Sequence, residues 1–288
     1  MNRQRNYVWF VGAMVLTVGL VAVLAWGIVN REWIVDYIQG VSYQPTAEMS
    51  TIRDKLKLTD RGKFLFNATR PQLDEKETFN NVCRAATDTE VAVLGCYAGG
   101  NIYIYNIVSS ELAGIRELTT AHELLHAVWA RMSDEERTTL VEPLTKTFEA
   151  NQDLLGRELD TYDTGEKQEE LYVRAGTEVA DLPAELEKHY ATVFTDQDLI
   201  VQFYNSYIKV FREIEAEMNN LKAEMDTIGA EINTLKAEFE LAPTWALYYR
   251  INALVDEYNA RVEKYNADIE RYESLNQTIN SNVKVEGV

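Results

Sequence analysis

Hydrophobic residues follow three successive patterns along this chain. Residues 7–29 carry no charged side chain, and about 20 apolar residues are enough for a helix to cross a bilayer. The middle of the chain combines short alternating runs, typical of strands, with longer runs at helical spacing. From Tyr207 onward the apolar positions alternate in steps of four and three, which is typical of a coiled coil. The patterns therefore predict a membrane-spanning helix, a mostly helical α+β region and a C-terminal coiled coil.

Strand-like patterns are confined to the first half of the middle region. We expect a short helix at 47–58, a strand at 62–68 because its side chains alternate between turn residues, and a short helix at 75–83. Two further strands, 91–97 and 102–108, are separated by Ala-Gly-Gly-Asn. A short glycine-containing loop of this kind predicts a β-hairpin.

The second half of the middle region is expected to be helical throughout. Ser133-Asp-Glu-Glu136 is a capping box that starts a helix, and Pro183 stands where a helix can begin but not continue. The expected helices are 111–131, 134–150, 151–161, 167–181 and 184–194.

Two heptad-like seams make up the last third of the chain. Ala242-Pro243-Thr244 separates them, and a short turn favours an antiparallel coiled-coil hairpin within one chain. Pairing between copies, which would make the protein a homo-oligomer, is the alternative. The first seam is Tyr207, Phe211, Ile214, Met218, Leu221, Met225, Ile228, Ile232, Leu235 and Phe239; the second is Ile251, Leu254, Tyr258, Val262, Tyr265, Ile269, Tyr272, Leu275 and Ile279.

The uncharged segment 7–29 fits an uncleaved anchor better than a signal peptide. A signal peptide has an apolar region of about 7–15 residues and a small-residue cleavage site, for which the sequence around Trp26 is poor. Arg3 and Arg5 precede the segment, which predicts a cytoplasmic N-terminus and an extracytoplasmic remainder of a single-pass protein in the cell membrane. The expected parts are a stub and transmembrane anchor at 1–30, a juxtamembrane connector at 31–46, a main domain at 47–200, the coiled-coil hairpin at 201–280 and a disordered tail at 281–288.

Charge and cysteine content narrow the choice of partner and compartment. The chain of 288 residues has a formal net charge of −18 and no cluster of Lys and Arg, so nucleic acid is not expected as a partner. The two cysteines, Cys83 and Cys96, could form a disulfide if the domain lies in an oxidising compartment. Two buried thiols are the alternative.

The candidate chemistry lies in Thr119-Thr120-Ala121-His122-Glu123-Leu-Leu-His126-Ala-Val128. Residues four apart lie on one face of a helix, so both imidazoles can reach one metal ion while Glu123 lies beside it. This arrangement predicts a catalytic zinc site. Two core histidines satisfied by hydrogen bonds, with Glu123 in a buried ion pair, are the simpler alternative.

Residues 119–128 resemble the signature of the zincin metallopeptidases. The resemblance implies that His122 and His126 bind zinc and that Glu123 is the general base, in a domain whose hairpin precedes the active-site helix. Because no third histidine follows at the metzincin spacing, it also implies a carboxylate ligand from a later helix, as in the gluzincin branch. We favour Glu178, which stands among small residues, over Glu170, which follows a charged run typical of a solvated face.

The same resemblance implies further roles. A donor to the oxyanion is expected near the metal, and His189, Tyr190 and Tyr172 are the candidates. A peptide substrate is expected to pair with an edge strand at 101–107 and to contact Asn101, Tyr103 and Tyr105.

Two functions are therefore expected. The first is a membrane-anchored, extracytoplasmic zinc peptidase that hydrolyses peptide bonds with Glu123 as general base. The second is a non-catalytic envelope protein that works through its coiled coil.

Overall fold

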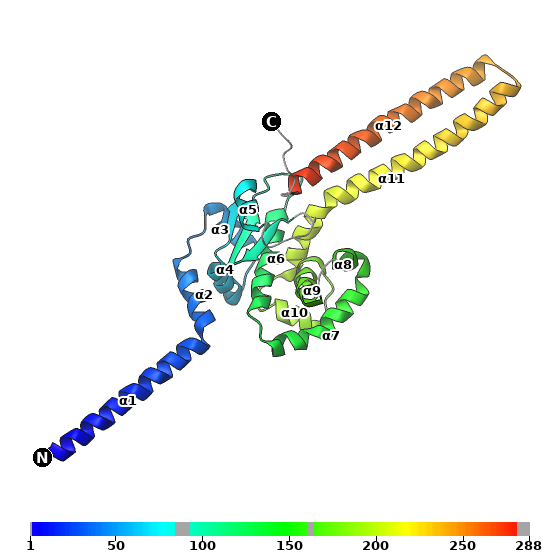
Figure 1. Cartoon of the computed structure of the whole chain (residues 1–288). Helices are drawn as coiled ribbons and strands as arrows, with labels where there is room; N and C mark the ends of the chain where they lie inside the picture. Colours follow the sequence, from blue (N-terminus) through cyan, green and yellow to red (C-terminus); the bar gives the residue numbers. More distant parts are fainter. Residues whose placement is uncertain (1, 84–92, 160–163, 281–288) are drawn as a thin grey trace.

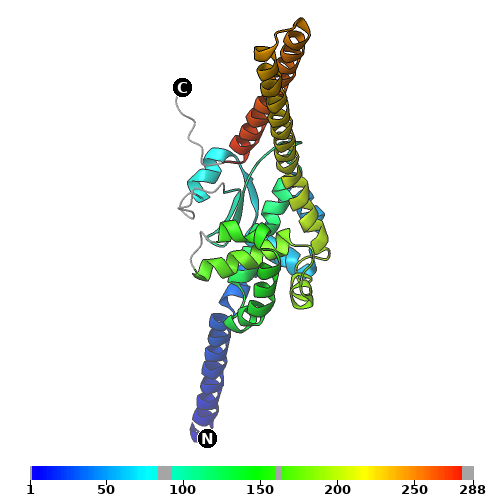
Figure 2. The same ribbon diagram turned by 90° about the vertical axis from the view of Figure 1, so that its right-hand side faces the viewer.

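The computed structural model describes residues 2–83, 93–159 and 164–280. A mostly helical body lies between two long protrusions (Figure 1). Helix α1 (Asn2–Val29) leaves the body at one end, and the pair α11 (Gln197–Leu241) and α12 (Trp245–Ile279) leaves it at the other. The view turned by 90° also shows α1 and the α11–α12 pair at opposite ends of the body (Figure 2). The expected α+β, mostly helical fold class is confirmed at this level.

Apart from α2 and α4, the helices of the body fall close to their expected places. Ser133 begins α7 with the expected capping box, since its side chain accepts from the backbone N–H of Glu136 while the Glu136 carboxylate accepts from the backbone N–H of Ser133. The body helices are α2 (Arg31–Ser42), α3 (Ala47–Lys55), α4 (Asp60–Thr69), α5 (Lys76–Cys83), α6 (Ile115–Ala130), α7 (Asp134–Ala150), α8 (Gln152–Leu159), α9 (Thr164–Glu178) and α10 (Ala184–Tyr190).

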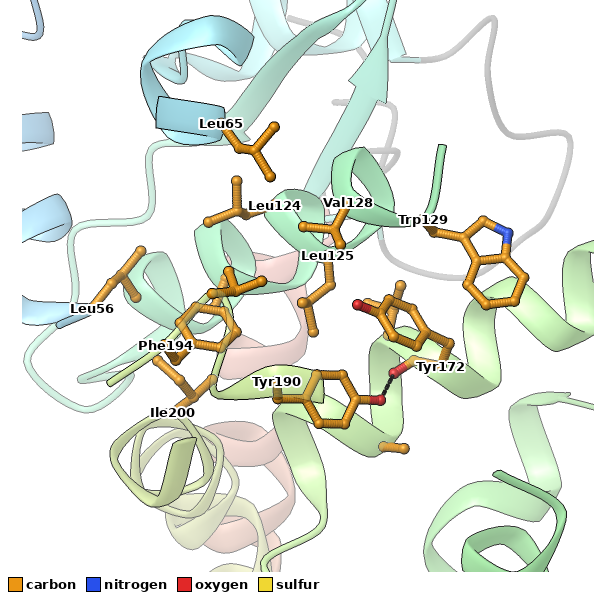
Figure 3. Packing of buried hydrophobic residues seen from close by; sticks show 14 of the residues in the cluster. Leu56, Leu65, Leu124, Leu125, Val128, Trp129, Tyr172, Tyr190, Phe194 and Ile200 are labelled. Carbon is orange, nitrogen blue, oxygen red and sulfur yellow. Dashed lines mark hydrogen bonds between the residues drawn. The ribbon is translucent and has the colours of Figure 1, made fainter. Parts of the chain in front are cut away.

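The core of the body surrounds α6. Leu124, Leu125 and Val128 of α6 are fully buried, and Tyr172 of α9 and Tyr190 of α10 pack below them (Figure 3). Almost the whole circumference of α6 is buried, so the helix that carries the histidines is held rigidly from several sides.

A small sheet covers another side of α6. Its strands are β1 (Gln72–Asp74), β2 (Gly95–Ala98) and β3 (Asn101–Tyr105), in the order β1-β3-β2. β2 and β3 are antiparallel, and the intervening glycines have positive φ angles of 56° and 81°. A two-residue turn of this kind is typical of a hairpin, so the expected hairpin is confirmed.

The strand expected at 62–68 is wrong, because this segment is helix α4. Thr59 caps the helix by accepting from the N–H of Gly62, and the buried positions Gly62, Leu65, Phe66 and Thr69 have helical spacing. The connector expected at 31–46 also contains a helix, α2.

The boundary expected at residue 200 falls inside one continuous helix. Ile200 and Val201 belong to the core side of α11, whose later part runs out into the protrusion. Parts of three expected elements, residues 91–92, 160–161 and 281–288, lie outside the described residues.

Helices α11 and α12 fold back on each other as the expected antiparallel hairpin within one chain (Figure 1). Ile228, Ile232 and Leu254 form a buried seam between them. Ion pairs flank the seam, with Arg250 to Glu231 at 2.8 Å as one example. At its base this arm packs against the segment that leads into α6, through a cluster of Ile107, Leu112, Ile115, Val210, Phe211, Ile214 and Leu275.

The apolar side chains described between Met14 and Val29 of α1 are exposed, including Leu16 at 76% and Ile28 at 76%. In the described part of the chain no single helix is long and apolar enough to cross a membrane. Leu16–Val29 and Arg31–Ser42, which are bent by 73° relative to each other, meet that requirement only as a pair.

Cys83 and Cys96 form a disulfide, so of the two alternatives for the cysteines the bridge is the one found. The bond joins the end of α5 to β2, the strand beside α6.

Candidate metal centre

Helix α6 presents His122 and His126 side by side. Their Nε2 atoms are 3.3 Å apart, and their side chains are 25% and 19% exposed. The four-residue spacing produces this proximity, since both residues lie on the same helix face. The two rings therefore share one partly open position at the surface of an otherwise buried helix.

Glu170 of α9 completes the group. Its Oε1 lies 3.7 Å from Nε2 of His122 and its Oε2 lies 3.5 Å from Nε2 of His126. One donor atom from each of the three residues lies within 4.8 Å of the others. Two imidazole nitrogens and one carboxylate thus converge on a single point.

Glu178, the preferred third ligand, does not belong to this group. Its carboxylate accepts two hydrogen bonds of 2.9 Å from the guanidinium of Arg174, and this pair is buried. The small residues around it have the expected effect on packing, because a Cβ at Gly176 would lie 2.6 Å from Leu125 of α6. That close approach, however, brings the carboxylate of Glu170, two turns earlier, to the histidines.

Glu169 contacts one of the two histidines, which the sequence did not predict. Its Oε1 lies 2.8 Å from Nδ1 of His126. A carboxylate on the outer ring nitrogen fixes the tautomer so that the other nitrogen can bind a metal. The adjacent glutamates followed by Leu171-Tyr172-Val173 were the available signal, because a charged pair leading into a buried run lies at the border of a core.

Glu123 lies beneath strand β2. Its side chain is almost fully buried, and a Cβ at Gly95 would lie 2.8 Å from its Oε1. The backbone N–H of Tyr97 donates to the same carboxylate. Gly95 therefore gives the strand room to cover Glu123, and α6 and β2 together fix its position.

Burial and neighbouring charges shift the pKa values of the group. Burial lowers the pKa of His122 to about 4, which favours the neutral ring that binds metals. Burial also opposes protonation of His126, but the hydrogen bond to Glu169 and the negative charge of Glu170 outweigh it and raise the pKa of His126 to about 10. Burial raises the pKa of Glu123 to about 7, within the range of a general base.

The strand expected to bind substrate is in the wrong place for that role. Tyr103 of β3 pairs with Gln72 on one side and with Cys96 on the other, so β3 is the central strand. Tyr105 stacks on Phe79, and the Asn101 side chain accepts from Arg70. Among the described strands, the edge beside Glu123 is β2.

The three candidates for the oxyanion donor are also directed elsewhere. Tyr190 is fully buried and its hydroxyl donates to the backbone oxygen of Tyr172 at 2.6 Å (Figure 3). The hydroxyl of Tyr172 pairs with Nε2 of His189 at 3.0 Å. The charges that act on His189 are those of Arg61 and Glu136, not those of the metal group.

Comparison of the chain with protein-family models, curated proteins and solved structures gives no significant match. The resemblance to zincins therefore stays a prediction that depends on residues 119–128 and on the geometry around them.

Proposed function

We propose that the protein is a zinc-dependent peptidase. The observation that carries this proposal is the convergence of His122, His126 and Glu170 on one point, with Glu123 one residue along the same helix. Two imidazoles and a carboxylate form one of the ligand sets of catalytic zinc, which leaves a fourth position open. Distances of 3.5 and 3.7 Å from Glu170 to the two rings are longer than ordinary hydrogen bonds and leave space for a cation.

In this proposal, Glu123 and Glu169 have separate roles in the hydrolysis of a peptide bond. Zinc, when bound, supplies a Lewis acid that acidifies a water molecule and polarises a peptide carbonyl. Glu123 accepts the proton of the attacking water and returns it to the leaving amine, for which its raised pKa is suited. Glu169 keeps the ring of His126 oriented toward the ion.

The substrate is proposed to lie along β2. An extended peptide can add to a free strand edge through backbone hydrogen bonds. β2 is the edge strand beside Glu123, and Gly95 brings its backbone against that carboxylate. The disulfide at Cys96 holds this strand to α5.

The enzyme is further proposed to work outside the cytoplasm, held to a membrane by α1. The exposed apolar side chains between Met14 and Val29 of α1 support an anchor, and Arg3 and Arg5, which precede the uncharged segment 7–29, favour a cytoplasmic N-terminus. The disulfide supports an oxidising compartment for the body.

Replacement of Glu123 by Gln tests the proposal. The full chain, purified in detergent without chelators, is expected to contain one zinc ion and to cleave members of an unbiased peptide library. Glu123→Gln should retain the zinc, because Glu123 is not a ligand, and should lose at least about a thousandfold in turnover because the general base is gone. Metal content by mass spectrometry and cleavage by peptide sequencing are the two measurements.

Glu117→Gln is the matched control. Glu117 is another buried glutamate of α6, and it pairs with Lys55 rather than with the histidines. This variant should keep both zinc and activity. A wild-type chain without zinc, or Glu123→Gln with full turnover, would refute the peptidase.

A non-catalytic interaction protein is the second candidate. The observation in its favour is the arm, which projects far from the body and carries exposed apolar residues at its end. A zinc-free, inactive wild-type chain would leave this as the better explanation.

A further inference from the structure

The end of the arm carries an exposed group of apolar side chains, here called the arm tip: Leu241, Trp245, Tyr248 and Tyr249. Leu241 is 89% exposed and Trp245 is 76% exposed. The three aromatic rings contact one another, with centroids 5.7 to 6.3 Å apart. The arm tip is therefore a preformed cluster and not a set of scattered side chains.

The coiled coil does not require this cluster. The buried seam of α11 and α12 is formed by Ile228, Ile232 and Leu254, farther down the arm. Between 239 and 249 the only charged residue is Glu240. A solvent-exposed helical turn normally carries polar residues, so a concentrated apolar group here indicates a binding surface.

Area and shape argue against a stable protein partner at the arm tip alone. With these exposed fractions, four such side chains offer on the order of 500 Å². A stable protein interface buries about 800 Å² on each partner. The arm tip is also the convex end of a narrow two-helix hairpin, which a soft surface fits more easily than a rigid one (Figure 1).

We propose that the arm tip inserts into the interfacial region of an electrically neutral lipid bilayer. Tryptophan and tyrosine are the side chains enriched at that depth, because an apolar ring and a polar group can each meet their preferred environment. Arg250, the nearest basic residue, is already paired with Glu231. Because Arg250 is paired and the protein is acidic overall, we expect insertion to be driven by apolar burial and not by attraction to anionic lipids.

The position of the arm tip indicates which bilayer it meets. Both views place it at the end of the molecule opposite α1 (Figures 1 and 2). A membrane entered by α1 therefore lies away from the arm tip, which faces a second bilayer surface. This inference does not depend on the peptidase activity.

Vesicle capture by the full chain tests the proposal. The chain is held through α1 in immobilised phosphatidylcholine nanodiscs, so that α1 is occupied, and fluorescent phosphatidylcholine vesicles are passed over it. The wild type is expected to capture vesicles, and Trp245→Ala/Tyr249→Ala at least tenfold fewer. Capture should be unchanged at about 1 M salt, where charge interactions are screened beyond roughly 3 Å.

Val108→Ala is the control, because Val108 is 78% exposed but lies on the body. It should capture vesicles like the wild type. Circular dichroism of the double variant should match the wild type, since Trp245 and Tyr249 are exposed and do not belong to the buried seam of the arm. The proposal is overturned if the wild type captures no neutral vesicles, if the double variant captures as many, if capture needs anionic lipid, or if the arm tips of two chains pair with each other instead of binding vesicles.

Discussion

Glu170 and Glu178 lie on the same helix, α9. Which of them lies beside the histidines depends on the position of α9 along the axis of α6. The two carboxylates are only about 80° apart around the helix, so periodicity alone does not separate them. The close contact of Gly176 with Leu125 fixes this relative position of the two helices. That packing involves helices far apart in sequence, which explains why the proximity of the two histidines was predictable from local spacing but the carboxylate beside them was not.

Replacing each of these two glutamates by glutamine, in separate variants, distinguishes a metal ligand from a structural residue. Glu170→Gln is expected to lower zinc affinity by at least about a hundredfold, because the amide is a far poorer ligand, with little change in the fold. Glu178→Gln should keep zinc but lower the free energy of unfolding by about 3 kcal/mol, because the buried carboxylate that accepts two hydrogen bonds from Arg174 becomes a neutral amide. Competition with a fluorescent chelator measures the first effect and denaturant unfolding the second; the reverse pattern would make Glu178 the ligand.

His189 provides a prediction about acid stability. Burial, aided by the positive charge of Arg61, lowers its pKa from 6.5 to about 4 in the folded chain. Between these pH values the unfolded chain takes up a proton that the folded chain refuses, so unfolding becomes easier as the pH falls. The contribution of neutral His189 to the free energy of unfolding is complete above about pH 6.5 and is lost progressively as the pH falls toward 4.

His189→Gln removes this titration and keeps a polar partner for the hydroxyl of Tyr172. Between pH 7 and pH 4 the unfolding free energy of the wild type should therefore fall more steeply than that of the variant, as measured by urea unfolding. Parallel curves for the two proteins would show that His189 does not carry the effect.

At the scale of elements, long helices were predictable because their periodic patterns extend over many turns. The short segment 62–68 was not, because Phe64 and Phe66 alternate like a strand while the burial of Leu65 and Phe66 follows a helix. Only packing against other elements decides between the two. A Cβ at Gly62 would lie 2.3 Å from the backbone oxygen of Val193, a contact that no local pattern contains.

The arrangement of the sheet could also be predicted only in part from the sequence. The hairpin of β2 and β3 was predictable from its glycine turn, but its free edge was not. β1 is only three residues long and pairs with β3 in parallel, so it makes β3 central and leaves β2 at the edge beside Glu123. A three-residue strand carries too little pattern to be recognised in a sequence.

At the scale of the whole molecule, a buried ion pair joins the segment after α1 to the candidate site. Asp36 of α2 accepts hydrogen bonds of 2.7 and 2.8 Å from Arg131, the C-cap residue of α6. The same guanidinium donates to the hydroxyl of Tyr97 in β2. Arg131 thereby connects α2, the helix of the histidines and the strand that covers Glu123.

Removing one partner of this pair should therefore weaken the whole body. Asp36→Asn is expected to lower the unfolding free energy by about 3 kcal/mol, because Arg131 keeps a largely buried charge without its carboxylate. Asp54→Asn, which breaks an exposed pair with Arg53, should change it by less than about 0.5 kcal/mol. In a double-mutant cycle, Asp36→Asn with Arg131→Gln should cost clearly less than the two single changes added together, because they remove one shared interaction. Denaturant unfolding of the full chain in detergent measures the four proteins of the cycle and the Asp54→Asn control, and strict additivity would show that the pair does not couple α2 to α6.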